Sequence, residues 1–246
     1  MTITATGLTK AAGAAAAVAG AIFIAVQIGH PSTDSFTTET TQWMARSGAK
    51  SAMAALALAG ITGMYLRQYR KAGALGLVGY LVFAVGYLAL LCVEVIAAAV
   101  LPTLVDSEPG FVNDLVAAAN GGTPSGDIGG VQTLLNVAGA GYIVGGFLFG
   151  LALFRTGVLT RWAAALLAVS TAATAALAVL PESFNRPLAV PAGIALIALG
   201  VSLWRNPRDG RQSGPATVPS TATFPTTATF PTTGMAVGPA GQPAVR

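Results

Sequence analysis

The chain has 246 residues, of which 54% are hydrophobic and only 9% are charged. Soluble globular domains carry about a quarter charged residues, so this composition excludes an ordinary soluble domain and indicates a membrane protein. The net charge of +4 comes from basic residues that form no contiguous patch or motif, so we expect no nucleic-acid binding. Because Cys92 and His30 are the single cysteine and histidine, an intrachain disulfide and a bis-histidine haem site are excluded.

Six apolar runs are long enough to cross the hydrocarbon core of a bilayer, which takes about 17–25 helical residues. Lipid offers the backbone no hydrogen-bond partners, and these runs are too uniformly apolar for the alternating strands of a barrel. We therefore predict an all-α, polytopic membrane bundle in residues 1–205, with transmembrane spans at about 8–28, 48–66, 74–101, 131–154, 160–180 and 188–204. The first run is too long for the apolar region of a signal peptide, so we expect an uncleaved anchor.

Basic residues are divided unevenly between the predicted connections. The first, third and fifth connections contain only Arg46, Lys50 and Arg186. The second and fourth connections and the start of the tail contain Arg67, Arg70, Lys71, Arg155, Arg161, Arg205, Arg208 and Arg211. Because basic loops stay on the cytoplasmic side, we predict a protein of the bacterial cytoplasmic membrane with both termini in the cytoplasm.

Two segments lie outside the predicted spans. Residues 102–130 form the long outer connection, in which 111–119 could form a short amphipathic turn that lies on the membrane surface or caps the bundle. From residue 206 onward the chain is rich in Pro, Thr, Gly and Ala, and the sequence ATFPTT occurs at 222–227 and again at 228–233. Such a composition cannot bury a core, so we predict that residues 206–246 are a disordered cytoplasmic tail.

Glycines in the fourth predicted span indicate close helix packing. Helix association in lipid relies on small residues that let backbones approach each other. At 100° per residue, Gly141 and Gly145 share one face, whereas Gly139, Gly146 and Gly150 share another. We therefore expect this span to lie centrally, with a neighbouring helix on each side.

Glu94 is the acidic residue that lies deepest in a predicted span, about two turns from the outer end of the third one. A charge within lipid costs several kcal/mol, which makes Glu94 the leading functional candidate. Tyr80 and Tyr87 precede it at steps of seven, so the three side chains follow one helical stripe at intervals of about 10 Å. We expect this stripe to face the bundle.

Other polar side chains fall at the depth of Glu94. Gln27 and His30 end the first predicted span, and Gln132 and Asn136 begin the fourth. We predict a polar pocket near the outer mouth, made of Gln27, His30, Glu94, Gln132 and Asn136. It is either a proton, cation or small-ligand site, with Glu94 titrating and His30 as its partner, or a hydrogen-bond network that fixes helix register. One His and one Glu are an incomplete metal-ligand set, and we predict no metal or cofactor.

Four stretches together suggest a family. They are VQIGHP at 26–31, GITGMYLRQ at 60–68, GALGLVGYLVFAVGY at 73–87 and GGFLFGLALFRTGVLTRWAAALLA at 145–168. These stretches resemble a group of small multi-pass membrane proteins common in actinobacteria and related bacteria. The resemblance runs from about residue 14 to 204, without the outer connection and the tail. It implies a bacterial membrane protein, and because the group has no established activity it assigns no role to any residue.

No GxSxG, HExxH, Walker A or dinucleotide-binding motif occurs in the sequence. The sequence therefore predicts no catalytic residue, and it weighs against an enzyme without excluding one. We expect a small transport or sensing component with an outward-facing polar pocket around Glu94, in which a small ligand or cation would bind. The alternatives are a membrane-embedded enzyme or accessory factor acting on lipid-borne substrates, and a structural or partner-binding membrane protein. The partner that the composition implies is the lipid bilayer.

Overall fold

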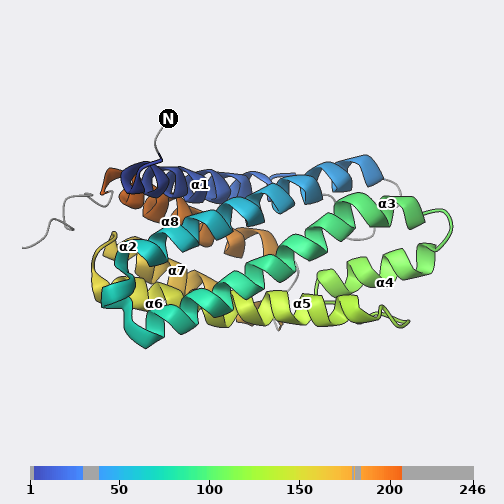
Figure 1. The fold of residues 1–246 in the computed structure, drawn as a ribbon. Helices are drawn as coiled ribbons and strands as arrows, with labels where there is room; N and C mark the ends of the chain where they lie inside the picture. Colours follow the sequence, from blue (N-terminus) through green and yellow to red (C-terminus); the bar gives the residue numbers. More distant parts are fainter. Residues whose placement is uncertain (1–2, 30–38, 179, 181–183, 207–246) are drawn as a thin grey trace, which may run out of the picture. The chain divides into compact units, whose positions relative to one another are not determined.

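The computed structural model describes residues 3–29, 39–178, 180 and 184–206, and within them the regular secondary structure is helical, without strands. This confirms the all-α prediction, while the predicted tail beyond residue 206 lies outside the described residues. The elements in chain order are α1 (Ala5–Ala25), α2 (Thr40–Val95), the π-helix η2 (Ile96–Val100), α3 (Leu101–Leu104), α4 (Pro109–Ala119), α5 (Gly130–Ala140), the π-helix η3 (Gly141–Gly145), α6 (Gly146–Thr156), α7 (Arg161–Ala173), the 3₁₀-helix η4 (Thr174–Ala178) and α8 (Asn185–Arg205) (Figure 1).

By length and composition, four helical stretches of the described residues could cross a membrane. They are Ala5–Ala25, Thr40–Leu104, Gly130–Thr156 and Arg186–Arg205. The sequence predicted six spans, and the difference has two causes. The second and third predicted spans both fall within Thr40–Leu104, whose backbone leaves the helical conformation at Gln68 and Gly73, and the fifth corresponds to a shorter apolar helix, Arg161–Leu177.

Helix α2 folds back on itself, so that its two halves lie side by side (Figure 1). The backbone leaves the helical conformation at Gly73, whose φ of 58° is a value that residues with a Cβ rarely adopt. Across the turn, the rings of Tyr65 and Tyr80 stack with their centroids 4.7 Å apart. Residues 40–67 and 74–95 therefore form an antiparallel helical hairpin, and we call them the first and second halves of α2.

Glycines set the contact between α1 and α8, which lie side by side (Figure 1). A Cβ added to Gly13 would lie 2.7 Å from the carbonyl oxygen of Gly200, and one added to Gly20 would lie 2.5 Å from that of Gly193. Because a real Cβ does not approach so closely, no larger residue fits at either position without a shift of the backbone. The pairing also shows that α1 and α8 run antiparallel.

Glycines of η3 and α6 contact helices on two sides, as the sequence predicts. A Cβ added to Gly141 would lie 2.6 Å from the Cα of Gly86 in the second half of α2. On the other side, a Cβ added to Gly146 would lie 2.5 Å from Thr171 in α7. The prediction that Gly139 shares the face of Gly146 is wrong, because an added Cβ at Gly139 meets open space. The π-helix between them has more residues per turn and rotates α5 relative to α6.

The turn of α2 and the ends of α6 and α8 meet at one end of the helices. Arg67 Nε donates a hydrogen bond to the Asn206 carbonyl oxygen, 3.0 Å away, and the Thr156 hydroxyl donates to Gln68 Oε1. The N-terminal half of α1 reaches the same end, since Gly13 packs against Trp204. We call this the basic end, and its basic residues are Lys10, Arg67, Arg70, Lys71, Arg155, Arg161 and Arg205.

At the opposite end, α4 packs on the helices instead of extending into solvent. Its buried residues are Val112, Leu115 and Val116, and they join Trp43 and Leu101 in an apolar cluster. The sequence left open whether residues 111–119 lie on the surface or cap the bundle. The structure supports the cap, because the apolar face of α4 is buried against α3, α5 and Trp43 of α2.

The connection that follows α4 is fixed by one carboxylate. Asp114 Oδ1 accepts hydrogen bonds from the Ser125 amide, 2.8 Å away, and from the Ser125 hydroxyl, 2.7 Å away, while Oδ2 accepts from the Gly126 amide at 2.9 Å. These hydrogen bonds, the one from the Ser125 amide first, hold the pKa of Asp114 below its ordinary value. Asp114 therefore holds residues 125 and 126 of the connection against α4.

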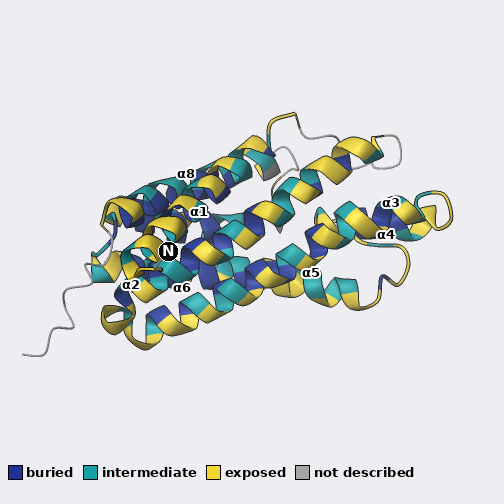
Figure 2. Cartoon of the chain, turned by 45° about the horizontal axis from the view of Figure 1, so that its top comes forward, coloured by how far each residue is buried: buried dark blue, intermediate teal, exposed yellow. Residues whose placement is uncertain are grey.

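The main core lies between α1, α2, α6, α7 and α8, where the buried faces of the helices meet (Figure 2). Its fully buried side chains include Ile61, Phe83 and Phe149. Large aliphatic side chains also cover the outside, as in Val18, which is 49% exposed, and Val169, which is 65% exposed. An apolar exterior of this kind is unfavourable in water and compatible with a lipid environment.

The glycine contacts predict a contrast between two alanine substitutions. Gly86→Ala places its Cβ 2.6 Å from the carbonyl carbon of Gly141, so we expect a loss of about 1–3 kcal/mol of unfolding free energy. Gly139→Ala is the matched control, because its Cβ meets open space and alanine favours the helix. Thermal unfolding in detergent measures both. Equal stabilities of the two variants would show that the Gly86–Gly141 contact does not limit packing.

The Asp114 contacts predict a loosening of this connection at acid pH. A carboxylate whose folded-state pKa is lowered contributes stability in full above the unfolded-state value, about 3.9 for Asp, and the contribution disappears as the pH falls through the folded-state pKa. Amide hydrogen exchange at Ser125 and Gly126 should therefore accelerate at acid pH relative to the intrinsic rate. In an Asp114→Asn variant these two amides should exchange faster already at neutral pH. Unchanged protection in this variant would show that the Asp114 hydrogen bonds do not fix the connection.

Candidate functional site

Glu94 lies on the second half of α2 and faces Lys50 on the first half. The Lys50 Nζ atom lies 3.5 Å from Glu94 Oε1, and the two side chains are 19% and 11% exposed, respectively. The side chain of Ser47, one turn before Lys50, also hydrogen-bonds to the Glu94 carboxylate. We call these three residues the Lys50–Glu94 site. It joins the two halves of α2 near the end that is remote from their connecting turn.

The helical stripe of Tyr80, Tyr87 and Glu94 faces inward, as the sequence predicts. Tyr87 is buried, at 2% exposure, and Glu94 at 8%. The Tyr80 hydroxyl lies 3.1 Å from Thr62 Oγ1 on the first half of α2, within hydrogen-bond distance. The stripe therefore supplies polar contacts between the two halves at both ends, Tyr80–Thr62 near the turn and Glu94–Lys50 far from it.

Between these contacts lies an aromatic layer that sequence reasoning missed. The ring centroid of Tyr142, in η3, lies 6.1 Å from that of Tyr87 and 5.9 Å from that of Phe83. Its hydroxyl is buried and has no hydrogen-bond partner among the described residues. The interpretation of this region from its glycines passed over Tyr142, although a tyrosine between two glycines of a tightly packed span signals a hydroxyl that needs a partner.

Gln27 binds other partners than Glu94. Its Nε2 donates to the Phe23 carbonyl oxygen at 3.2 Å, and its Oε1 accepts from Arg186 Nη1 at 3.5 Å. Within the described part of the chain, no hydrogen bond or ion pair joins Gln27 to Glu94. His30, which the sequence suggested as the partner of Glu94, lies outside the described residues.

Gln132 and Asn136 bind each other on the surface of α5. Gln132 Nε2 donates to Asn136 Oδ1 at 3.2 Å, and the pair is exposed. The contacts of these polar side chains thus form two separate groups, Gln132 with Asn136 and Glu94 with Lys50. No contact between those groups appears among the residues that the structure describes, so their convergence on one pocket stays a prediction.

Arg46 and Lys50 are functional candidates that the sequence analysis treated only as loop charges. Arg46 Nη1 donates to the carbonyl oxygens of Val26 at 2.9 Å and Ile28 at 3.0 Å, and Nη2 donates to that of Gly29 at 2.6 Å. These carbonyls end α1 and would otherwise lack partners. The spacing of Arg46 and Lys50, four residues apart, places both on one helical face and could have indicated a polar face opposite Glu94.

The chemistry that this arrangement supports is ionic. In the described segments, no group of three or more His, Cys, Asp or Glu side chains could hold a metal ion. The Lys50–Glu94 site instead contains a carboxylate, an ammonium group and a hydroxyl within reach of one another. Glu94 can take up or release a proton, or another cation can take the place of the Lys50 ammonium group beside its carboxylate.

Comparisons with known proteins assign no family. No protein-family model, no curated protein and no solved structure matches the chain. The resemblance to small multi-pass membrane proteins therefore stays a prediction, and a function has to be proposed from the residues themselves.

A double-mutant cycle should measure the coupling between Lys50 and Glu94. Breaking a fully buried pair costs about 3–5 kcal/mol; because these side chains remain partly exposed, we expect about 1–3 kcal/mol for Glu94→Gln or Lys50→Met alone. The double variant should lose less than the sum of the two, because neither charge is left unpaired. Unfolding in detergent at neutral pH provides the measurement, and additive losses would mean that the two charges do not interact.

Proposed function

We propose that the protein is a six-span integral membrane protein of the bacterial cytoplasmic membrane, with both termini in the cytoplasm. In this proposal it is a small transport or sensing component, and the Lys50–Glu94 site near its outer face is the group that titrates or exchanges a cation. The observation that carries the proposal is the largely buried ion pair, in which Lys50 Nζ lies 3.5 Å from Glu94 Oε1 and the side chains are 19% and 11% exposed.

The helix lengths and directions support six crossings. One crossing comes from each of α1, the α5–η3–α6 stretch, α7 with η4, and α8, and two come from the antiparallel halves of α2. The apolar helix at 161–177 is short but close to the minimum of about 17 residues for a span. Helices that are close in sequence pack antiparallel, as successive membrane crossings must.

The charge distribution supports the proposed orientation. Seven Lys and Arg side chains of the described residues gather at the basic end, which holds the N-terminal half of α1 and the C-terminal end of α8. Basic residues are retained on the cytoplasmic side. The opposite end carries Asp106, Glu108, Asp114 and Asp127, and the separation of these acidic residues from the basic end supports an outer position for α4 and the Lys50–Glu94 site.

The structure of the site supports a role for protonation. Lys50 is the charged residue that contacts Glu94. Ser47 is uncharged, and so are all the polar residues of α5, namely Gln132, Thr133 and Asn136. A proton on Glu94 would remove the attraction that holds Lys50 and would weaken the junction between the halves of α2. A cation would have to displace the Lys50 ammonium group, so the site favours a proton over a weakly bound ion.

The alternatives have less support. An enzyme acting on lipid-borne substrates would need a nucleophile or a second acid beside Glu94. Ser47 is the hydroxyl there, and its hydrogen bond is to the carboxylate itself, with no histidine within the described contacts to activate it. A purely structural ion pair is the remaining alternative, and it differs from the proposal in its response to pH.

The test compares hydrogen exchange of the full chain in lipid vesicles between about pH 8 and pH 4, corrected for the intrinsic rate. In the wild type we expect residues 44–54 and 90–100 to become less protected as the pH falls. Glu94→Gln should be loosened at every pH, because its amide cannot bind Lys50 as an ion. Glu108→Gln, at an exposed acidic residue, is the matched control and should behave as the wild type.

One result would contradict the proposal, and another would decide between its two forms, titration and cation exchange. If Glu94→Gln kept the pH dependence of the wild type, the Lys50–Glu94 pair would be structural. If the wild type loosened at constant pH on addition of sodium or potassium ions, cation exchange rather than protonation would operate the site.

A further inference from the structure

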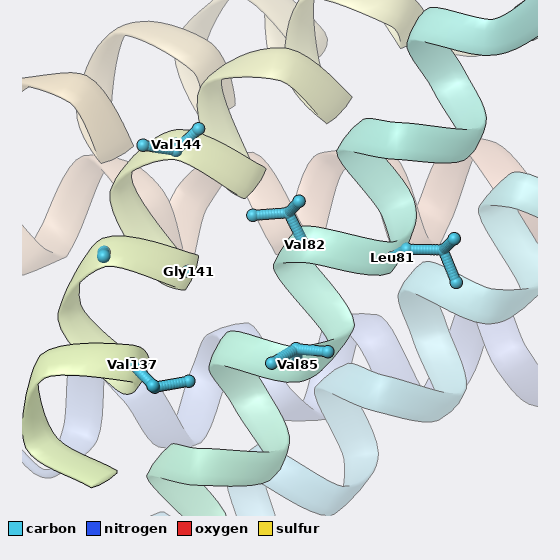
Figure 3. A pocket seen from close by; sticks show the side chains of 7 residues that line it. Leu81, Val82, Val85, Val137, Gly141 and Val144 are labelled. Carbon is cyan, nitrogen blue, oxygen red and sulfur yellow. The ribbon is translucent and has the colours of Figure 1, made fainter. Parts of the chain in front are cut away.

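An open apolar groove runs between the second half of α2 and the α5–η3 stretch (Figure 3). Leu81, Val82 and Val85 line it from α2, and its volume is about 430 Å³. From the other side it is lined by Val137 and Ala140 of α5 and by Gly141 and Val144 of η3. Every lining residue is aliphatic or glycine, so the groove can accept only an apolar occupant.

The groove opens to the outside of the helices. Leu81 is 50% exposed, Val85 is 51% exposed and Val144 is 48% exposed. Under the proposed six-span topology, on which this inference rests, the side chains around the groove face the hydrocarbon core of the bilayer. Its occupant would therefore come from within the membrane.

One wall of the groove continues into polar side chains toward the outer end. Gln132, Asn136, Ala140 and Val144 follow one another at steps of four, so they share a helical stripe. Gln132 Nε2 bonds to Asn136 Oδ1, and no described residue binds the remaining amide groups, Gln132 Oε1 and Asn136 Nδ2. An exposed donor and an exposed acceptor thus lie one to two turns beyond the apolar wall.

A second copy of the chain fits this groove poorly. Helices associate in lipid through small residues that face the partner. Here Gly141 faces inward, since a Cβ added to it would lie 2.6 Å from the Cα of Gly86 of the same chain. The side chains that border the groove on the outside are branched, as in Val85, Val137 and Val144, and they keep another helix backbone at a distance. A slender, flexible chain meets no such obstacle.

We propose that this groove binds one membrane lipid, with an acyl chain between α2 and η3 and a polar headgroup hydrogen-bonded to Gln132 and Asn136. The amide donor suits a phosphate or ester oxygen, and the amide acceptor suits a hydroxyl group. Such a lipid is retained in place, in contrast to the lipids that exchange freely around the rest of the apolar surface. It also packs against the half of α2 that carries Glu94.

The experiment uses the full chain in phosphatidylethanolamine–phosphatidylglycerol vesicles that contain a phospholipid with a photoactivatable diazirine on one acyl chain. After illumination, mass spectrometry locates the labelled residues. We expect labelling to concentrate at 81–85 and 137–144, well above that of other exposed aliphatic positions, such as Val18 and Ile194.

Two substitutions should remove the lipid in different ways. Ala140→Leu fills the groove and should abolish the concentration of labelling there. Asn136→Leu deletes the headgroup contact and should lower groove labelling about fivefold, as expected for the loss of one hydrogen bond. Ala55→Leu is the matched control, because Ala55 is an exposed alanine of the first half of α2, away from the groove. Its labelling should equal that of the wild type, and thermal unfolding confirms that all three variants are folded.

Equal labelling of the groove and of the other exposed positions would overturn the inference and leave only ordinary solvation by lipid. Disulfide formation between two copies of a Val85→Cys, Cys92→Ala variant in membranes would also overturn it, in favour of a second copy. Both results require an inserted protein. A wild-type chain removed from vesicles by alkaline carbonate would instead refute the proposed membrane topology.

Discussion

The structure depends on close contact between helix backbones. In lipid the burial of apolar side chains brings no gain over contact with acyl chains, so helices are held together by packing and by the few polar groups between them. Gly13 with Gly200 and Gly86 with Gly141 allow these contacts, because a single added Cβ would lie within 2.7 Å of the neighbouring backbone. The α1–α8 pair and the contact between α2 and η3 both follow from this constraint.

The two halves of the α2 hairpin are also joined by contacts between polar side chains. Near its turn Tyr80 meets Thr62, and at its far end Glu94 meets Lys50. Glycine contacts cannot change with solution conditions, whereas an ion pair can. The far end of the hairpin is thus the part of the described core that can respond to protons, and this is why the proposed function is centred there.

The sequence predicted much of this framework from simple periodicity. The inward stripe that ends at Glu94 follows from steps of seven, and the two packing faces of Gly141 and Gly146 follow from the helical repeat. Gly139 was assigned to the wrong face because a π-helix changes the number of residues per turn. No pattern in the sequence predicts this π-helix. The break between the second and third predicted spans corresponds to the turn of α2, where the backbone at Gln68 and Gly73 leaves the helical conformation.

Partners of side chains were harder to predict than faces. The sequence analysis grouped Glu94 with Gln132 and Asn136 because all three fall at one depth, but depth does not specify direction around the helices. Lys50 was counted as a loop charge, although its position opposite Glu94 follows once α2 is known to fold back. The predicted pocket that joins these amides to Glu94 stays a prediction, and the amides also lie on the helix that lines the aliphatic groove, where we propose a lipid site.

The central claim is that the α2 hairpin crosses the membrane twice, with its turn in the cytoplasm and the Lys50–Glu94 site toward the outside. Cysteine labelling of whole cells with a membrane-impermeant maleimide tests it most directly, on a Cys92→Ala background. Asp106→Cys, at an exposed residue beyond the hairpin, should be labelled from outside, and Arg70→Cys, in the turn, only after the membrane is permeabilised. Labelling of Arg70→Cys in intact cells would contradict the account.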